Sequence, residues 1–328
     1  MIIITLLSYK LYYNLIEIER GSYMKKKSLL CLLSFMLLAS CNNSENLTIL
    51  VPTGAPSLAF YNHIDNVNFT SNNSPINIAS SMTNNGSDIV VIDAIKGIDA
   101  IINGAPYKLA ANLTFGNFYL ASTGNDDNDT LDKDDVIVSF GMGQTPQKVF
   151  ELIYGNDFTN MSYVTNVSEA ATCLISKKTL DKAKDVDYVF IAQPVLTNAL
   201  SKNKDASIYA NIQEEYTRIT GKSLIQAGLF IKDSVSKNDS KAFLEDLNED
   251  IDELLANPSL LDKYSENEEI TNKFTTLYGI NSTLAKKTIE NNNVIGLGFK
   301  YACDNKENIN EFISLFNLTI KDENIYQK

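Results

Sequence analysis

Residues 136–154 read VIVSFGMGQTPQKVFELIY, and this stretch decides the fold class of the chain. The run VIVSF predicts a buried strand, and apolar residues at helical spacing after Pro146 predict a helix. Two glycines flank Met142 in the loop between them, where backbone N–H groups at a helix N-terminus often face a ligand. The stretch lacks the lysine of a P-loop and the third glycine of a dinucleotide fingerprint. We interpret it as the strand, ligand loop and helix of an α/β protein, not as a nucleotide-binding loop.

The same alternation of strand and helix extends over most of the chain. Further strands are predicted at short apolar runs: 47–51, 76–79, 88–92, 107–111, 118–122, 161–164, 188–192 and 227–231. Helices are predicted at 57–64, 94–102, 146–154, 168–176 and 195–201, and nearly everywhere after residue 234, with a new helix opening at Pro258. Continuous apolar strands separated by helices are typical of open, mostly parallel sheets that are covered on both faces.

The N-terminal region carries a segment typical of export. Residues 24–41, MKKKSLLCLLSFMLLASC, place three lysines before an apolar run and small residues before a cysteine, as a signal peptide does. The apolar run is shorter than the roughly 20 residues that a membrane-spanning helix needs. Its end, Leu-Ala-Ser-Cys, resembles the lipobox of bacterial lipoproteins, in which the cysteine, here Cys41, is lipidated and becomes the mature N-terminus. The alternative is an ordinary secretory signal with an incidental cysteine.

Residues 1–23 precede this signal. We expect Met24 to be the native start and residues 1–23 to be translated upstream sequence. If Met1 is the start, the apolar and aromatic stretch 2–16 is an additional membrane-associating segment. With the expected start at Met24, residues 24–40 are the signal peptide and residues 41–46 are a tether.

The charge of the chain argues against nucleic acid as a partner. The net charge is −12, and removal of residues 1–40, which hold five basic and two acidic side chains, changes it to −15. A chain this acidic, without a basic cluster, is repelled by a phosphate backbone. After residue 40 the only arginine is Arg218, so bidentate guanidinium recognition of a solute has one candidate donor.

Cysteine and histidine usage limits the chemistry further. Cys173 and Cys303 lack CxxC spacing and neighbouring histidines, so no metal site is expected; one disulfide and two free thiols both remain open. The single histidine, His63, falls in the first predicted helix without a partner for Ser-His-Asp or HExxH chemistry. The acidic stretch 124–135 lacks the spacing of a calcium loop. We expect no catalytic residues, no metal and no cofactor.

Small and polar residues follow several of the predicted strands. They are the loop 53–57, Asp93, the loop 141–146 and the pair Gln193-Pro194. In open α/β sheets, ligands bind beyond the carboxyl ends of the strands, where helix N-termini supply free N–H groups. The sequence therefore predicts a binding site built from these loops.

Several of these motifs, in this order, resemble a known family. They are the lipobox, TGAPSLAF at 53–60, DIVVIDA at 88–94, LTFGNFYLAS at 113–122, VSFGMGQTPQKVF at 138–150 and VDYVFIAQPVLTNAL at 186–200. Together they are similar to the substrate-binding lipoproteins of ABC importers, especially the branch for thiamine-pyrimidine, nitrate and sulfonate-type solutes. A later strand of that family commonly ends in Glu-Pro. This chain has Gln193-Pro194 instead, so the charge of that glutamate is not carried over.

The resemblance implies a type II periplasmic-binding fold with two α/β lobes that close on a solute like a hinged clamp. Lobe 1 would contain residues 47–116 and 226–328, and lobe 2 residues 117–225. The chain would cross between them near residues 113–118 and 222–228. The protein would be a monomer and not an enzyme, lipid-anchored on the outer face of the bacterial cytoplasmic membrane, and it would deliver its solute to a permease.

Within this fold we expect ten residues to contact the solute from the two sides of the cleft. They are Thr53, Gly54, Ser57, Asp93, Thr114, Asn117, Gly143, Gln144, Thr145 and Gln193. Ser57 and Thr145 have an alternative role as helix caps. Phe115 and Phe118 either stack on a flat ring or belong to the core. A bulky residue at Thr145 is expected to abolish binding and to leave the fold intact.

Two other function classes stay open. One is a surface lipoprotein of the same fold that binds a macromolecule. The other is an enzyme related to thiamine-pyrimidine synthesis, although the cysteine-rich motif of those enzymes is absent from this sequence.

Overall fold

Two β-sheets organise residues 46–125 and 130–327, which are the residues that the computed structural model describes. The six-stranded sheet has the order β11-β4-β10-β3-β1-β2, and the five-stranded sheet has the order β7-β6-β8-β5-β9. The strands of the first sheet are β1 (Ile49–Pro52), β2 (Phe69–Asn72), β3 (Ile89–Asp93), β4 (Tyr107–Thr114), β10 (Ala227–Lys232) and β11 (Leu297–Tyr301). Those of the second are β5 (Phe118–Ser122), β6 (Val136–Phe140), β7 (Asn160–Val164), β8 (Tyr188–Ala192) and β9 (Ser207–Asn211).

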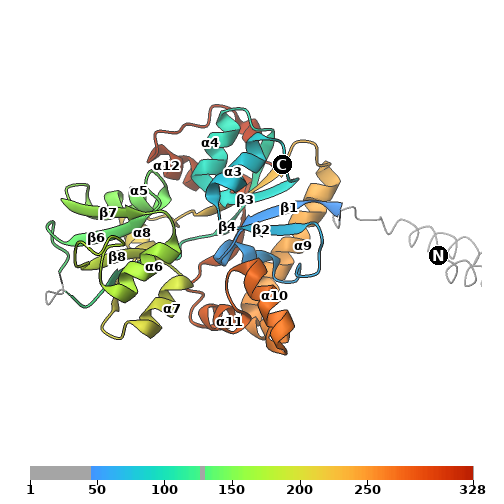
Figure 1. Ribbon diagram of the computed structural model, residues 1–328. Coiled ribbons are helices and arrows are strands. Elements are labelled where there is room, and N and C mark those ends of the chain that lie inside the picture. The colour runs from blue at the N-terminus through green and yellow to red at the C-terminus, as the bar shows by residue number, and fades with distance from the viewer. Residues whose placement is uncertain (1–45, 126–129, 328) are drawn as a thin grey trace, which may run out of the picture. The chain divides into compact units, whose positions relative to one another are not determined.

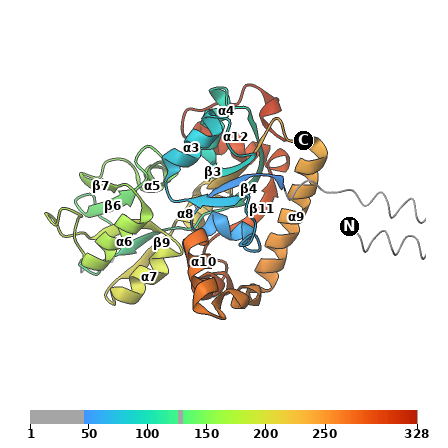
Figure 2. The same ribbon diagram turned by 45° about the vertical axis from the view of Figure 1, so that its right-hand side comes forward.

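Helices flank both sheets, and we name each sheet with its helices a lobe. Lobe 1 contains the helices η2 (Ala55–Phe60), α3 (Pro75–Thr83), α4 (Ala94–Ile102), α9 (Lys237–Ala256), η3 (Pro258–Ser265), α10 (Glu268–Tyr278), α11 (Ser282–Glu290), η4 (Ala302–Asp304), α12 (Lys306–Ser314) and η5 (Glu323–Ile325), where η marks a 3-10 helix. Lobe 2 contains α5 (Thr145–Tyr154), α6 (Val167–Ser176), α7 (Val195–Lys202) and α8 (Ile212–Thr220). Figure 1 and Figure 2 both show β6, β7, α6 and α7 together on one side and α3, α4, α9 and α10 on the other.

The strand pairings are mixed, not mostly parallel as the sequence predicted. Among the described strands, four pairings are parallel and five are antiparallel. All five antiparallel pairings involve β4, β5 or β10, the strands next to the segments that connect the two sheets. A chain that comes from the neighbouring lobe enters a sheet at the carboxyl ends of its parallel strands. The strand that starts there therefore runs antiparallel to them.

The chain passes between the sheets at residues 115–117 and 222–226. Every described strand of lobe 1 lies in residues 49–114 or 227–301, and every described strand of lobe 2 in residues 118–211. Backbone hydrogen bonds tie these connections together, since the Gln226 N–H donates to the Thr114 carbonyl at 3.1 Å. The Phe115 N–H donates to the Gly296 carbonyl at 2.9 Å.

The sheet of lobe 2 is apolar on both faces, which explains the continuous apolar strands in the sequence. Phe118 and Leu120 pack in one core cluster with residues of α5 and α8. Tyr119 and Ala121, which alternate with them along β5, pack in another cluster with residues of α6 and α7. Helices therefore cover both faces of this sheet.

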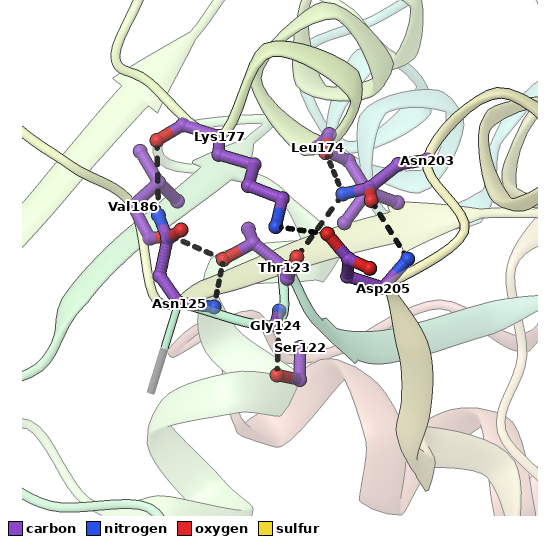
Figure 3. Close-up of polar contacts among 9 residues, drawn as sticks. All are labelled: Ser122, Thr123, Gly124, Asn125, Leu174, Lys177, Val186, Asn203 and Asp205. Atoms are coloured by element: carbon purple, nitrogen blue, oxygen red, sulfur yellow. Dashed lines mark hydrogen bonds and ion pairs between the residues drawn. The ribbon is translucent and has the colours of Figure 1, made fainter. Parts of the chain in front are cut away.

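A network of side-chain amides closes one end of the sheet of lobe 2, as Figure 3 shows. Asn203 Nδ2 donates to the carbonyls of Thr123 (3.1 Å) and Leu174 (2.8 Å), and Asn125 Nδ2 donates to that of Val186 (3.0 Å). Thr123 and Asn125 follow the carboxyl end of β5. Because β5 and β8 are antiparallel, this end is opposite to the end where β8 runs into Gln193. The network supplies donors to carbonyls of Thr123, Val186 and the last part of α6.

Several predicted elements differ in the structure. Residues 76–79, predicted as a strand, lie inside α3, because Ser74 caps that helix (Asn77 N–H to Ser74 Oγ, 3.4 Å) and Pro75 begins it. The predicted helix 57–64 is the shorter 3-10 helix η2, so His63 lies in the turn that follows, with its ring 5.6 Å from that of Phe60. Strands β2, β9 and β11 were not predicted.

The expected start at Met24, the signal peptide 24–40, lipidation of Cys41 and nearly all of the tether 41–46 lie outside the described residues. Within the described ranges, no helix combines the length and the apolar character that a membrane span requires. The buried Cys173 and the exposed Cys303 are both free thiols.

Candidate functional site

A cleft of about 870 Å³ is lined by both lobes. Its walls include residues at or just after the carboxyl ends of six strands, which are β1, β2 and β3 in lobe 1 and β6, β7 and β8 in lobe 2. The first residues of β5 and β10 also line it, because these strands begin where their antiparallel neighbours end. The cleft thus lies where ligands bind in open α/β sheets.

Five α-helices begin at this cleft, and four of them are capped by side chains of the protein itself. The caps of α3, α4 and α6 are Ser74, Asp93 and Asn166, whose oxygens accept backbone N–H groups at 3.0–3.4 Å. Gln193 Oε1 accepts the N–H and hydroxyl of Thr197 in the first turn of α7, at 3.1 and 2.8 Å. Helix α5 has no side-chain cap at Gln144. The positive ends of four helices are therefore already matched with protein oxygens.

A hydrogen bond joins the two lobes at the cleft. Thr145 Oγ1, at the start of α5, donates to Asp93 Oδ2 at 2.7 Å, while the Lys96 N–H donates to Asp93 Oδ1 at 3.1 Å. Burial raises the pKa of the Asp93 carboxyl above its ordinary value, and these two hydrogen bonds act in the opposite direction. Asp93 and Lys96 are the only charged side chains among the described residues that line the cleft.

The structure brings six of the ten expected site residues to the cleft wall. They are Thr53, Gly54, Asp93, Asn117, Gln144 and Gln193. The other four, Ser57, Thr114, Gly143 and Thr145, do not line it. Ser57 and Thr145 are fully buried.

The hydrogen bonds of these four residues are to the protein. Ser57 Oγ lies 2.7 Å from the Gly54 carbonyl and 3.1 Å from the Tyr278 carbonyl. Thr114 Oγ1 accepts the Ala227 N–H at 3.1 Å. The Gly143 N–H donates to Gln147 Oε1 at 2.8 Å, so this amide is not directed at a solute. These groups position the loops that line the cleft.

Sequence reasoning missed several residues of the cleft wall. They include Asn72, Asn73, Lys96, Phe140, Thr165, Asn166, Ser168 and Gln226. Thr165 and Asn166 follow a predicted strand, so the strand-end rule would have identified them. Asn72 ends β2 and Asn73 follows it, and this strand had no apolar signal. Of the two phenylalanines proposed for stacking, Phe118 lines the cleft but is only 2% exposed, with its ring 5.8 Å from that of Phe140.

Two amide oxygens in the cleft wall have no partner. They are Asn117 Oδ1, on the first connection between the lobes, and Gln226 Oε1, on the second. Both are buried, and neither has a hydrogen bond to any described residue. Seven carboxamide side chains line the cleft altogether: Asn72, Asn73, Asn117, Gln144, Asn166, Gln193 and Gln226. No group of three or more His, Cys, Asp or Glu side chains within residues 46–125 and 130–327 is arranged to hold a metal ion.

No protein-family model matches the chain, and no curated protein sequence matches it either. Solved structures do resemble it. A structure of an ABC transporter from Parabacteroides distasonis matches at 18% identity and a TM-score of 0.65, over 83% of this chain and 91% of its own. The ligand-binding component of an ABC-type import system from Staphylococcus aureus, with zinc bound, matches at 8% and 0.60, over 86% and 96%. The periplasmic aliphatic sulphonate-binding protein SsuA from Escherichia coli matches at 12% and 0.59, over 83% and 86%.

These similarities establish the fold and not the activity, because the identities are low. The two-lobed α/β fold that the sequence resemblance implied is confirmed.

Proposed function

We propose that the protein is the extracytoplasmic solute-binding component of an ABC importer, which captures a small organic solute between its lobes and delivers it to a membrane permease. Residues 47–116 with 226–328 and residues 117–225 would be the two moving units. Thr53, Gly54, Asp93, Asn117, Gln144 and Gln193 would contact the solute, joined by Gln226. The protein would bind and release the solute without changing it.

The observation that carries this proposal is the position of the cleft. It lies between two lobes that are connected by only two short segments, and both lobes contribute strand ends and helix N-termini to its wall. A solute that contacts both walls favours the closed arrangement of the lobes by its differential affinity for that state. The volume of about 870 Å³ is within the range of small-molecule sites.

A ligand screen tests this function. The chain from residue 42 onward is titrated with pyrimidines, sulfonates, flavins and amino acids, and thermal unfolding is followed. A solute at 100 times its Kd is expected to stabilise the fold by about 2.7 kcal/mol. Small-angle scattering with and without that solute should show closure. Failure of every small molecule, together with binding of a macromolecule to the purified protein, would favour the surface lipoprotein instead.

We further propose that the protein is anchored through a lipid on Cys41, on the outer face of the bacterial cytoplasmic membrane. The support is the signal-like stretch that ends in Leu-Ala-Ser-Cys. Cells that express the full chain or Cys41→Ser are grown with an alkyne-labelled fatty acid. Label is expected in the first protein and not in the second. Mass analysis of the unprocessed Cys41→Ser chain tests the start at Met24, because cleavage before Cys41 removes that start from the lipidated protein.

A further inference from the structure

We propose that the solute carries polarised N–H groups, as an amine, an amidine or an amino-substituted heterocycle does, and that the cleft excludes sulfonates and other oxyanions. This inference rests on the proposed function, because it assigns the chemical class of the solute to the same cleft. Three acceptor side chains at the junction of the two lobes carry it: Asn117, Gln226 and Asp93.

Asn117 presents an acceptor whose orientation is fixed. Its Nδ2 donates to the Gln193 carbonyl at 2.9 Å, and exchange of the amide oxygen and nitrogen would bring two oxygens to that distance. The Oδ1 atom is therefore the free end of the amide. The side chain is 3% exposed, lines the cleft and leaves Oδ1 without a partner among the described residues. A buried acceptor without a partner is destabilising, and a donor on the solute removes that cost.

Gln226 presents the second acceptor from the other connection. Its backbone is held on both sides, because its N–H donates to the Thr114 carbonyl (3.1 Å) and its carbonyl accepts the Ala94 N–H (2.9 Å). Its Oε1 is buried without a partner among the described residues, in the wall of the same cleft. The two connections thus each carry a buried amide oxygen without a partner among the described residues, on a side chain of the cleft wall.

Asp93 adds a carboxylate beside Gln226. Ala227, the next residue, pairs with Asp93 across β10 and β3. The Asp93 carboxyl accepts hydrogen bonds from Thr145 and from the backbone N–H groups of Lys96 and Ile95, and a carboxylate has about four lone-pair sites, so acceptor capacity remains. A sulfonate placed against this carboxylate and two amide oxygens would meet acceptors and a like charge, which is unfavourable at short range.

Many of the groups that usually bind oxyanions are occupied by the protein at this cleft. Protein side chains already cap four of the five α-helices that begin there, so one or two N-terminal N–H groups of each of these four have partners. Lys96 is the single cationic side chain that the described part of the chain contributes to the wall, and it is exposed. Arg218 pairs with Glu215 on α8 and does not line the cleft. The site therefore complements donors better than it complements acceptors.

A matched pair of probes tests the solute class. Benzamidine and benzenesulfonate share a flat ring of the same size, and they differ in presenting N–H donors or sulfonate oxygens. Calorimetry is extended to agmatine, cytosine and 4-aminopyrimidine on one side, and to ethanesulfonate, methylphosphonate and nitrate on the other. We expect binding only among the donors. Binding of an oxyanion in preference to every donor would overturn this inference and leave the solute-binding function standing. Binding of neither set would count against both.

Two substitutions of Gln226 give a second test, because they are expected to affect the binding affinity differently. With the donor that binds best, Gln226→Met is expected to weaken binding about tenfold, because the acceptor is lost. Gln226→Glu keeps an oxygen at this position and adds negative charge, so binding of a cationic donor should be as tight as in the wild type or tighter. Gln327→Met, outside the cleft wall, is the matched control and should not change the affinity. Unchanged binding in Gln226→Met, or weaker binding of a cation to Gln226→Glu, would refute the role of this oxygen.

Discussion

Thr145 Oγ1 in lobe 2 donates a 2.7 Å hydrogen bond to Asp93 Oδ2 in lobe 1. The sequence predicted both residues as solute contacts, and in the structure they contact each other. Asp93 still lines the cleft, whereas Thr145 is fully buried behind it. The hydrogen bond therefore connects the two lobes directly.

Replacement of Thr145 by valine removes the donor and keeps a similar volume. We expect solute affinity to fall about tenfold, because hydrogen bonds to charged groups contribute about 1.5–3 kcal/mol and part of that favours closure. Calorimetry gives the affinity, and small-angle scattering without solute should show a more open average. Thr172→Val, on the exposed side of α6, is the control. Equal affinities in the two variants would show that the contact does not contribute to closure.

A bulky residue at position 145 is expected to do more than the sequence suggested. Because Thr145 has no exposed surface, a phenylalanine would have to displace the start of α5. Loss of binding should then be accompanied by a loss of about 1–3 kcal/mol in the free energy of unfolding, measured by urea denaturation. An unchanged stability would restore the original prediction of an intact fold.

The carboxyl of Asp93 should make stability depend on pH. Burial raises its pKa in the folded state, so the folded chain binds this proton more tightly than the unfolded chain. Its contribution is most favourable below the ordinary aspartate pKa of about 3.9 and is lost as the pH rises through the raised value. The free energy of unfolding of the wild type, relative to Asp93→Asn, should therefore fall from about pH 4 toward neutrality. Urea denaturation at stepped pH measures this difference, and a rise with pH is the contrary result.

Ser57 should affect stability and not binding. Its hydroxyl is buried against the carbonyls of Gly54 and Tyr278 and does not line the cleft. We expect Ser57→Ala to lower the free energy of unfolding by about 1–2 kcal/mol, because a carbonyl loses its donor. The solute affinity should stay within about twofold of the wild type. Ser314→Ala, at an exposed hydroxyl that bonds Glu311, is the control. A large loss of affinity with unchanged stability would identify Ser57 as a solute contact.

Gly279 and Gly221 form a matched pair. Both follow a helix in the left-handed conformation, with φ of 70° and ψ of 10° and 9°. A Cβ at Gly279 would lie 2.7 Å from Thr53 Cβ, whereas a Cβ at Gly221 meets no atom within 4 Å. Each alanine variant should lose about 1–2 kcal/mol from the strained backbone. Only Gly279→Ala should also displace Thr53 and weaken solute binding. Thermal unfolding and calorimetry compare them, and equal behaviour would mean that the 53–54 loop tolerates the added methyl group.

The sequence predicted the central strands well and missed three strands at sheet edges. β2, β9 and β11 each lie at the edge of a sheet, and their side chains are half-buried or exposed for most of their length. Such strands do not need a continuous apolar run, so the pattern that identified the inner strands was absent. The false strand at 76–79 has the opposite cause. Its short apolar run lies on a helix in which Ile78 is buried and Ile76 is exposed, and the Ser-Pro signal before it was the better guide.

The sequence predicted several residues of the cleft wall that lie at or just after the carboxyl ends of strands. The strand-end rule led to Thr53, Asp93 and Gln193, which line the cleft. It could not separate residues that face the cleft from residues that support it, such as Ser57, because both occur in the same loops. Gln226 gave no such signal, since it precedes a strand and reaches the cleft only because β10 runs antiparallel to β3.

The positions of Asn117 and Gln226 have a mechanical consequence. The two connections are the hinge about which the lobes would rotate, and each carries one of the unpartnered amide oxygens. A solute held there would contact both lobes close to the hinge. Exposed side chains such as Met142 and Ile76 are distant from the two connections along the chain. A small rotation at the hinge would produce a large displacement at the outer ends of the lobes. Binding of a solute near the two connections could thus be detected by a partner that contacts only the outer ends of the lobes.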